Sequence, residues 1–364
     1  PGPLCVFGDR AFPLVTAATD DGQQPLAAAA FLGRGRIVTF GHGGFLTSQH
    51  PGTIRLIKNA LDWTSGEKPV DQIRVGLYRL PDLELAEFQT EAVGFDRLNE
   101  VDVLILKLQH LKHARETARL KAFLEQGGGL IVGATGWGWK QMNRGKDLIH
   151  HFQGNLLLRP AGIAWTDRAF QRPSRSGFPV QRPSAWTQAG MAFDLMSKQP
   201  ADLSKEERRG VLDILTTASR TLPLDEPILM TRLTAWSSSM EDSQRIPTSK
   251  RPIREKDIAH KLRVELEEKI RYRLPVGAVN KHPAAIHFPG DVPTKVKRGR
   301  GIIELNTAIP GWHSTGMYAA PGERIQAGPG THDAQAPQLR SLSPVPPLWL
   351  EATPREWRCF PTLR

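Results

Sequence analysis

The stretch Val101-Asp-Val-Leu-Ile-Leu106, with the residues that follow it, decides the fold. This run is short, apolar and rich in branched side chains, which predicts a strand buried on both faces of a parallel sheet. A similar run, Leu130-Ile-Val-Gly-Ala134, predicts a second buried strand. Residues from His113 to Gln126 lie between the two runs and have the spacing of an amphipathic helix.

The predicted helix has an apolar face because Leu120, Phe123 and Leu124 fall at i, i+3 and i+4. Three glycines at 127–129 end it, since glycine tolerates the left-handed conformation after a helix. The unit is therefore strand, crossover helix and strand, followed by a turn at Thr135–Trp139. That turn lies at the carboxyl edge of the predicted sheet, where open α/β sheets bind their ligands.

The chain before this unit shows the same alternation of strands and helices, which is typical of a parallel sheet covered by helices. We predict an α/β fold with a parallel sheet and flanking helices, followed by a mostly helical region and a short β segment. The elements expected upstream are strands at Cys5–Phe7 and Phe12–Val15, small apolar filler at Ala27–Leu32, a strand at Gly35–Phe40, a helix at Pro51–Trp63, a strand at Ile73–Tyr78 and an acidic loop at Asp82–Glu100.

Downstream the alternation fades and helices dominate. Expected here are a helix at Asp147–Leu158, a loop or lid at 166–190, a helix at Leu203–Ala218 that opens with a Ser204…Glu207 capping box, a helix at Glu255–Leu274 and a strand at Gly301–Leu305. The predicted domains are 1–165 (α/β), 166–236 (loop and helical extension), 237–252 (linker), 253–326 (basic helix and β segment) and 327–364 (a disordered tail rich in Pro and Gly).

Composition limits the class of protein. The chain has 364 residues, 40% of them hydrophobic, which is enough for a sizeable core. The net charge of +11 is concentrated in residues 245–300, which hold fifteen Lys or Arg and six Asp or Glu. Only two cysteines are present, Cys5 and Cys359, which favours a reducing, cytosolic setting.

No run of the sequence approaches the roughly 18 apolar residues of a membrane span. Because the chain begins at Pro1 without a methionine, we expect a fragment.

Catalytic residues are not apparent at the predicted carboxyl edge. A nucleophile elbow would place a Cys or Ser on the turn after Leu130–Ala134, and this chain has Thr135 there, with no His or acid close in sequence to activate it. We interpret Thr135 as a turn residue packing under Trp137 and Trp139. The glycine turn Gly41–Gly44 lacks the spacing of a nucleotide loop, and its His42 is interpreted as a turn histidine.

The histidine pairs do not predict a metal site. His150 and His151 are adjacent, so on a helix they would point in different directions and not chelate one ion. His110 and His113 have a ligating spacing but no evident third ligand, and we interpret them as residues at a helix start. We therefore predict no catalytic, metal-binding or cofactor-binding residues and no cofactor.

The basic region has several interpretations. The Glu255–Leu274 helix mixes Lys and Arg with Glu265, Glu267 and Glu268, which favours a helix packed on its own domain over a lipid- or phosphate-binding face. The run Lys295–Arg300 is interpreted as a solvated loop, with a localisation signal as the alternative. Tyr272 and Phe288 are the only aromatic residues in the basic segment, so nucleic acid is not an expected partner.

One downstream segment resembles a known family. The motifs Pro310-Gly-Trp312, Ser314-Thr-Gly316, Tyr318 and Pro321-Gly-Glu323 resemble the opening of the enhancin-like M60 metallopeptidase domain. The resemblance implies that residues 253–326 hold a basic helix and an incomplete N-terminal part of an M60-like domain. Together with Phe7–Pro13 and Phe40–Gly44 upstream, the chain resembles the TRP channel-associated factors, also called experimental autoimmune prostatitis antigens. The resemblance covers roughly residues 1–326 and implies a class I glutamine amidotransferase-like, flavodoxin-like first domain.

The resemblance implies a function that composition does not. Its members are non-enzymatic regulators that bind the melastatin-type, cold-activated TRP channel, promote its delivery to the plasma membrane and adjust its gating, with effects on cell migration. The M60 zinc motif His-Glu-x-x-His is missing from this sequence. Because the sequence departs from the family pattern after Ile325, we expect a truncated or alternative C-terminus.

Three hypotheses follow. The first is a pseudoenzyme adaptor in the cytoplasm, recruited to the cytosolic face of the plasma membrane by the cytosolic segments of a TRP cation channel. The second is an amidotransferase-like hydrolase that uses an unrecognised Thr, Ser or His. The third, a nucleic-acid binder acting through residues 245–300, predicts affinity that falls steeply with salt. The sequence does not predict the oligomeric state or the docking surface.

Overall fold

A computed structural model describes most of the first two thirds of the chain and short pieces of the rest. The described residues are 1–19, 22–66, 68–81, 83, 85, 87–170, 180–198, 202–240, 248, 250, 252–274, 278, 295–296, 311–314, 349–352 and 357–360. The chain divides into two compact units, Pro1–Trp236 and Ser237–Arg364. The other predicted domain boundaries remain predictions.

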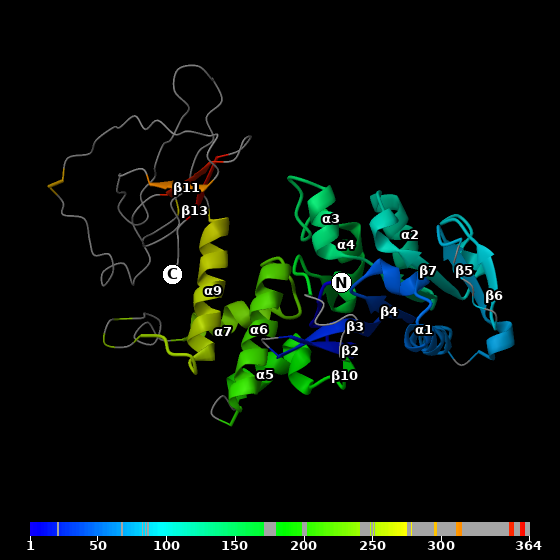
Figure 1. The fold of residues 1–364 in the computed structure, drawn as a ribbon, viewed down its shortest axis with the longest axis horizontal. Coiled ribbons are helices and arrows are strands. Elements are labelled where there is room, and N and C mark those ends of the chain that lie inside the picture. Colours follow the sequence, from blue (N-terminus) through cyan, green and yellow to red (C-terminus); the bar gives the residue numbers. More distant parts are fainter. Residues whose placement is uncertain are drawn as a thin grey trace, which may run out of the picture. The chain divides into compact units, whose positions relative to one another are not determined.

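An eight-stranded sheet forms the centre of the first unit (Figure 1). Its strands, in spatial order, are β10 (Val180–Gln181), β2 (Ala11–Thr19), β3 (Gly22–Leu32), β4 (Gly35–Phe40), β8 (Gly129–Gly133), β7 (Val103–Lys107), β5 (Arg74–Tyr78) and β6 (Gln89–Ala92). The pairs from β4 to β6 are parallel, and the pairs from β10 to β4 are antiparallel. The α/β fold is thus confirmed, with an antiparallel extension on one side of the parallel strands.

Helices cover both faces of this sheet (Figure 1). The helices of the first unit are α1 (Pro51–Thr64), α2 (Ala114–Glu125), α3 (Gly136–Met142), α4 (Gln153–Leu158), α5 (Ala189–Lys198), α6 (Lys205–Thr221) and α7 (Met230–Ser239), which ends just beyond the unit boundary. The short 3-10 turns are η1 (Gly43–Thr47), η2 (Val70–Gln72), η3 (Leu98–Glu100), η4 (Leu108–His110), η5 (Arg159–Ala161) and η6 (Ala185–Thr187).

The first unit has two hydrophobic clusters, one on each face of the sheet, and strand β7 contributes to both. Its side chains alternate, so Leu104 and Leu106 enter one hydrophobic cluster while Val103 and Ile105 enter the other. Residues of α2, α3 and α4 complete the first cluster, and α1 completes the second. The predicted strand, helix and strand at 101–134 are therefore confirmed, with α2 flanked by His113 and Gln126.

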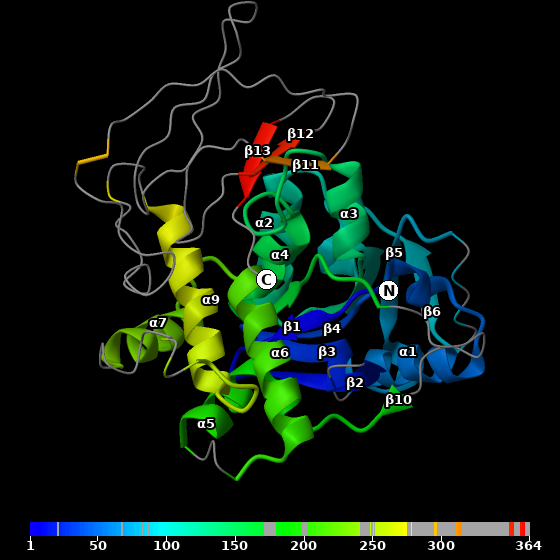
Figure 2. The same cartoon turned by 60° about the vertical axis from the view of Figure 1, so that its left-hand side comes forward.

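A small two-stranded sheet closes the first cluster. β1 (Leu4–Val6) pairs antiparallel with β9 (Ile163–Trp165). The amide of the buried Asn155 donates to the carbonyls of Leu148 (3.2 Å) and Trp165 (3.0 Å), and its oxygen accepts the N–H of Trp165 (2.7 Å). Helix α6 packs beside β1 and β3 (Figure 2) and begins with the predicted Ser204 capping box.

Several expectations are corrected in the first unit. The segment Ala27–Leu32, expected as small apolar residues without a strand, is the second half of strand β3, because alanines fit a strand buried on both faces. The acidic loop at Asp82–Glu100 contains the edge strand β6. The region 166–190, expected as a loop, includes β10 and η6, and α5 begins at Ala189.

Two further corrections concern the region after β8. The expected turn at Thr135–Trp139 is largely helix α3, because buried Trp139 packs on Phe152 with ring centroids 5.2 Å apart. The expected helix at Asp147–Leu158 is present only from Gln153 onward. Its first part is a separate turn, in which the Asp147 carboxylate accepts the backbone N–H of His150 at 2.7 Å.

The second unit contains helix α9 (Ile258–Arg273), as the sequence predicts, and a three-stranded antiparallel sheet of β11 (Gly311–Ser314), β12 (Trp349–Ala352) and β13 (Trp357–Phe360). Two of these strands lie within the tail predicted as disordered, so those residues have paired, extended backbone. The predicted strand Gly301–Leu305 lies outside the described residues.

We predict that Asn155→Ala destabilises the first unit strongly. Alanine would leave the buried N–H of Trp165 and two carbonyls without their partner, so the free energy of unfolding should fall by about 2–4 kcal/mol. Urea unfolding followed by circular dichroism measures it. The control Asn143→Ala removes one bond from a half-buried amide to Trp139 and should cost about 1 kcal/mol. Equal losses in the two variants would contradict the anchoring role of Asn155.

Candidate functional site

The carboxyl edge of the parallel strands brings three loops together. Phe40 at the end of β4 pairs with Gly133 of β8, which pairs with Lys107 of β7. A Cβ atom on Gly133 would lie 2.9 Å from the carbonyl oxygen of His42, so only glycine lets the two loops approach this closely. The loops after β4, β8 and β7 therefore meet at one place.

Thr135 has none of the features of a nucleophile elbow. Its backbone is extended, with φ −123° and ψ 103°, and it lies immediately before α3 without a side-chain cap. An elbow requires a strained strand-to-helix turn. Among the described residues the one non-glycine with positive φ is Arg79, at 54°. Thr135 is therefore the residue that precedes helix α3, where the sequence predicted a turn.

His42 caps the turn η1. Its Nδ1 accepts the backbone N–H of Gly44 at 2.9 Å, and its ring lies edge-on to Phe45 at 6.1 Å. Burial lowers the pKa of His42, and the positive charge of Lys107 lowers it further. The imidazole is therefore neutral at pH 7, with Nδ1 already used as an acceptor.

Lys107 and Gln109 lie against the same loop. A Cβ atom on Gly43 would be 3.2 Å from Oε1 of Gln109 and 3.3 Å from Cγ of Lys107. Oε1 of Gln109 is buried and has no hydrogen-bond donor among the described residues. Buried polar atoms normally have hydrogen-bond partners, so the unpaired oxygen of Gln109 is unusual and marks this edge as a candidate site.

His110 and His113 do not form a metal site. His110 ends η4, and burial lowers its pKa, followed by the positive charges of Arg79, Lys107 and Lys112. His113 precedes α2, where the Glu116 carboxylate accepts the backbone N–H groups of Lys112 (2.9 Å) and His113 (3.1 Å). Within the described part of the chain, no group of three His, Cys, Asp or Glu side chains is arranged to hold a metal ion.

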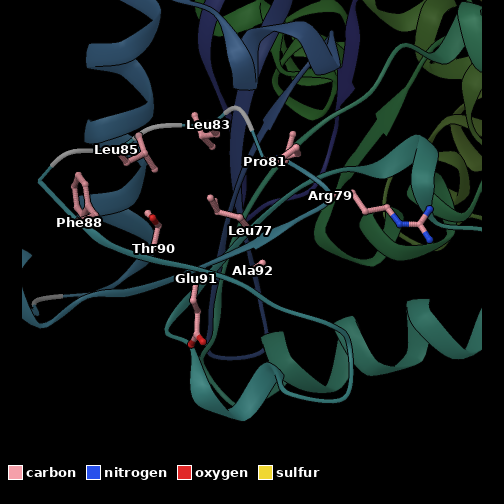
Figure 3. Close-up of a pocket in the computed structure, with 10 residues that line it drawn as sticks. Leu77, Arg79, Pro81, Leu83, Leu85, Phe88, Thr90, Glu91 and Ala92 are labelled. Carbon is pink, nitrogen blue, oxygen red and sulfur yellow. The ribbon is translucent and has the colours of Figure 1, made fainter.

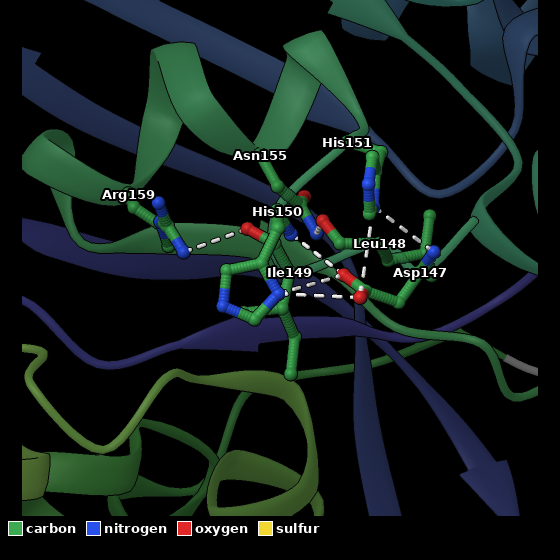
Figure 4. A network of polar contacts seen from close by, with 7 residues as sticks. All are labelled: Asp147, Leu148, Ile149, His150, His151, Asn155 and Arg159. Carbon is green, nitrogen blue, oxygen red and sulfur yellow. Dashed lines mark hydrogen bonds and ion pairs between the residues drawn. The ribbon is translucent and has the colours of Figure 1, made fainter.

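His150 and His151 are oriented differently from the expectation based on a helix (Figure 4). Both rings turn toward Asp147, with Nδ1 of His150 3.1 Å and Nδ1 of His151 3.6 Å from its carboxylate oxygens. The segment before Gln153 is not helical, so adjacent side chains converge. Burial raises the pKa of Asp147, but the hydrogen bonds from His150 and the charges of both histidines hold it below its usual value.

An apolar pocket of about 620 Å³ lies between the edge strands and the loop that follows β5 (Figure 3). The loop contributes Leu80, Pro81, Leu83, Leu85 and Phe88, and the strands contribute Leu77, Thr90, Glu91 and Ala92. Arg79 completes the lining, but its guanidinium points away from the apolar side chains.

The basic segment is described mainly at helix α9. Ile258, Leu262 and Leu266 are buried along one side of this helix. Arg263 is also buried, at 3% exposure, and pairs with Glu267 at 2.7 Å. Lys250, Arg254 and Lys256 are exposed. Of the run Lys295–Arg300, only the first two residues are described, so its expected role is untested.

Sequence reasoning did not identify Arg79, Lys107, Gln109 or Lys112 as site residues. Each follows a predicted strand or precedes a predicted helix, which is the signal that would have located them.

None of the described helices is both long and apolar enough to cross a membrane.

We predict that His42 titrates below its ordinary pKa of 6.5 in the folded chain. Since the unfolded chain then binds the proton more readily, lowering the pH through the region below 6.5 should reduce the free energy of unfolding. His110 acts in the same direction. Ring resonances assigned by His42→Gln and His110→Gln would give each midpoint by NMR. A midpoint at or above 6.5 for His42 would contradict the buried, cationic setting.

Comparisons with known proteins place this chain among its relatives. The profile of a family described as "TRPM8, N-terminal domain" matches residues 1–181. A TRPM8 channel-associated factor homolog from Danio rerio is 33% identical over 201 residues, which is 53% of this chain and 20% of the relative. TRPM8 channel-associated factor 1 from Homo sapiens is 32% identical over 181 residues, or 46% of this chain and 18% of the relative.

A solved structure also matches. IMPa from Pseudomonas aeruginosa, in complex with an O-glycopeptide, is 15% identical with a TM-score of 0.37 and covers 79% of this chain and 33% of its own. This chain spans about a fifth of the length of the curated relatives that it matches. Through the domain at residues 1–181, the chain belongs to the TRPM8 channel-associated factor family.

Proposed function

We propose that this chain is a non-enzymatic adaptor that binds cytosolic segments of a melastatin-type TRP channel, promotes its delivery to the plasma membrane and adjusts its gating. The observation that carries the proposal is the family membership of residues 1–181, because the relatives are named as factors associated with the TRPM8 channel. The adaptor is in the cytoplasm and reaches the cytosolic face of the membrane through the channel.

The geometry of the carboxyl edge supports a role without catalysis. Thr135 has an extended backbone, and its side chain makes no capping hydrogen bond to helix α3. His42, the neutral base near the same edge, uses Nδ1 to accept the N–H of Gly44. A nucleophile needs a base within hydrogen-bond reach to be activated.

The second unit is the proposed docking region, because residues 245–300 carry most of the net positive charge. Charge attracts an acidic partner surface and speeds the encounter. Arg263 is unsuited to this role, since it is buried and paired with Glu267. The exposed side chains of Lys250, Arg254 and Lys256 are the ones available to a partner.

We predict that reversing three exposed charges weakens channel binding. The variant Lys250→Glu, Arg254→Glu, Lys256→Glu should bind the purified cytosolic tails of the channel at least about tenfold more weakly, because attraction becomes repulsion. Titration by biolayer interferometry in moderate salt measures this. A charge-matched control reverses Arg115, Lys121 and Arg144, which are exposed on the first unit.

The control should bind like the unmodified chain, and circular dichroism should show both variants folded. Equal weakening of both variants would mean that net charge, and not the docking region, determines affinity. No binding by the unmodified chain would contradict the adaptor function for this sequence.

The alternative is a hydrolase of the amidotransferase type. The neutral His42 at the carboxyl edge favours it, because a neutral imidazole can accept a proton. The adaptor proposal predicts no amide or ester hydrolysis in a substrate screen. Turnover that is lost in both Thr135→Val and His42→Gln, but kept in His50→Gln, would establish the hydrolase and contradict the adaptor without enzymatic activity.

A further inference from the structure

Basic residues from separate loops gather at the carboxyl edge of the parallel sheet. Arg79 follows the residue of β5 that pairs with Leu106, and Lys107 follows Leu106 on β7. Neighbouring strands are about 4.8 Å apart, so the two residues begin side by side. Only β8 separates β7 from β4, whose following loop carries His42. The sheet register therefore places these three residues at one edge.

The loops complete this group. The side chains of Lys107 and Gln109 lie beside Gly43, directly after His42, where a Cβ atom would come within 3.3 Å of both. His110 and Lys112 follow on the connection from η4 to α2. We define the edge cluster as the five basic residues His42, Arg79, Lys107, His110 and Lys112.

Within the part of the chain that the structure describes, Arg79, Lys107 and Lys112 form no ion pair with a carboxylate. The Arg79 guanidinium lies 5.3 Å from the centroid of the Tyr78 ring. The acid nearest in sequence to Lys112, Glu116, uses its carboxylate to accept backbone N–H groups at the start of α2.

Arg79 also has an unfavourable backbone conformation. Its φ of 54° is in the left-handed region, which glycine and asparagine adopt more easily than arginine. Residues held in such conformations are concentrated at functional sites. The conformation directs a charged side chain away from the neighbouring apolar pocket (Figure 3).

The two histidines respond to this positive potential. Burial is the first cause of the lowered pKa of each, and nearby cations lower it further: Lys107 for His42, and Arg79, Lys107 and Lys112 for His110. Like charges that lower a histidine pKa must lie near it, so the shifts agree with the sheet register. A bound anion would act in the opposite direction and raise both pKa values.

We propose that the edge cluster binds a small phosphate-bearing molecule at the carboxyl edge of the parallel sheet. The site goes beyond the adaptor function and does not depend on it. Three permanently charged side chains match a multivalent anion better than a single carboxylate. A phosphate group carries up to two negative charges and three strong acceptor oxygens, which suit Arg and Lys donors. The buried Oε1 of Gln109 lacks a donor among the described residues, so a donor group of a ligand that reached it would form a hydrogen bond that is otherwise missing.

Inorganic pyrophosphate is the probe, titrated into the full chain by calorimetry, with acetate at equal ionic strength as comparison. We expect saturable binding of pyrophosphate, and a rise of the pKa of His42 and His110 followed by NMR. Lys107→Gln should weaken binding by about tenfold or more, because one charged hydrogen bond is lost. Arg79→Asn, which tolerates the left-handed backbone, should weaken it similarly.

Lys121→Gln is the matched control. It removes the same charge from α2, where Lys121 lies 3.8 Å from Glu125 near the other end of the helix, and should change affinity by less than about twofold. Without ligand, Lys107→Gln should raise the pKa of both histidines, and Lys121→Gln should not. The proposal is overturned by equal losses in Lys107→Gln and Lys121→Gln, or by no saturable binding up to roughly 10 mM, which is weaker than any specific site of this kind.

Discussion

The burial of β7 and β8 on both faces is the constraint on which the rest of this structure depends. Every residue of β8 is buried, and Val103 to Leu106 of β7 have no exposed surface. A strand in this position needs a helical layer on each side, which α1 and α2 supply. Its neighbours β4 and β5 run parallel to β8 and β7, so the loops that follow all four strands lie at the same edge. The edge cluster follows from this pairing.

The sequence predicted this central unit well because its signal is local. Branched apolar runs and a helical period specify β7, α2 and β8 to within about two residues, which is the usual uncertainty of a helix or strand end. The sequence predicted the antiparallel strands β2, β3 and β10 less well. The alanines at 27–30 have no period, since both faces of β3 are buried, and their strand character comes from pairing with β2 and β4. Tertiary context decides such segments.

The candidate site was predictable in location but not in composition. The glycine turn Gly41–Gly44 and the turn at Thr135 were recognised as lying at a carboxyl edge, yet the cations come from β5 and β7. Their convergence depends on strand order, which no local pattern encodes. The arrangement at Asp147 was missed because the sequence pattern predicts one continuous helix, whereas the chain forms a separate turn there before α4 begins at Gln153. The burial of Arg263 also depends on packing, and its charged residue type indicates the opposite.

The pairing of β1 with β9 has a consequence for the order in which the domain forms during synthesis. Leu4 leaves the ribosome early, but its partner Trp165 follows only after most of the first unit has been made. The same holds for Phe40, because its partner Gly133 is synthesised 93 residues later. Such long-range pairings are slow to form and leave strand edges open meanwhile. The nascent chain therefore exposes its apolar amino-terminal strands to chaperones or to neighbouring chains until residue 165 has emerged, which makes this domain sensitive to premature termination.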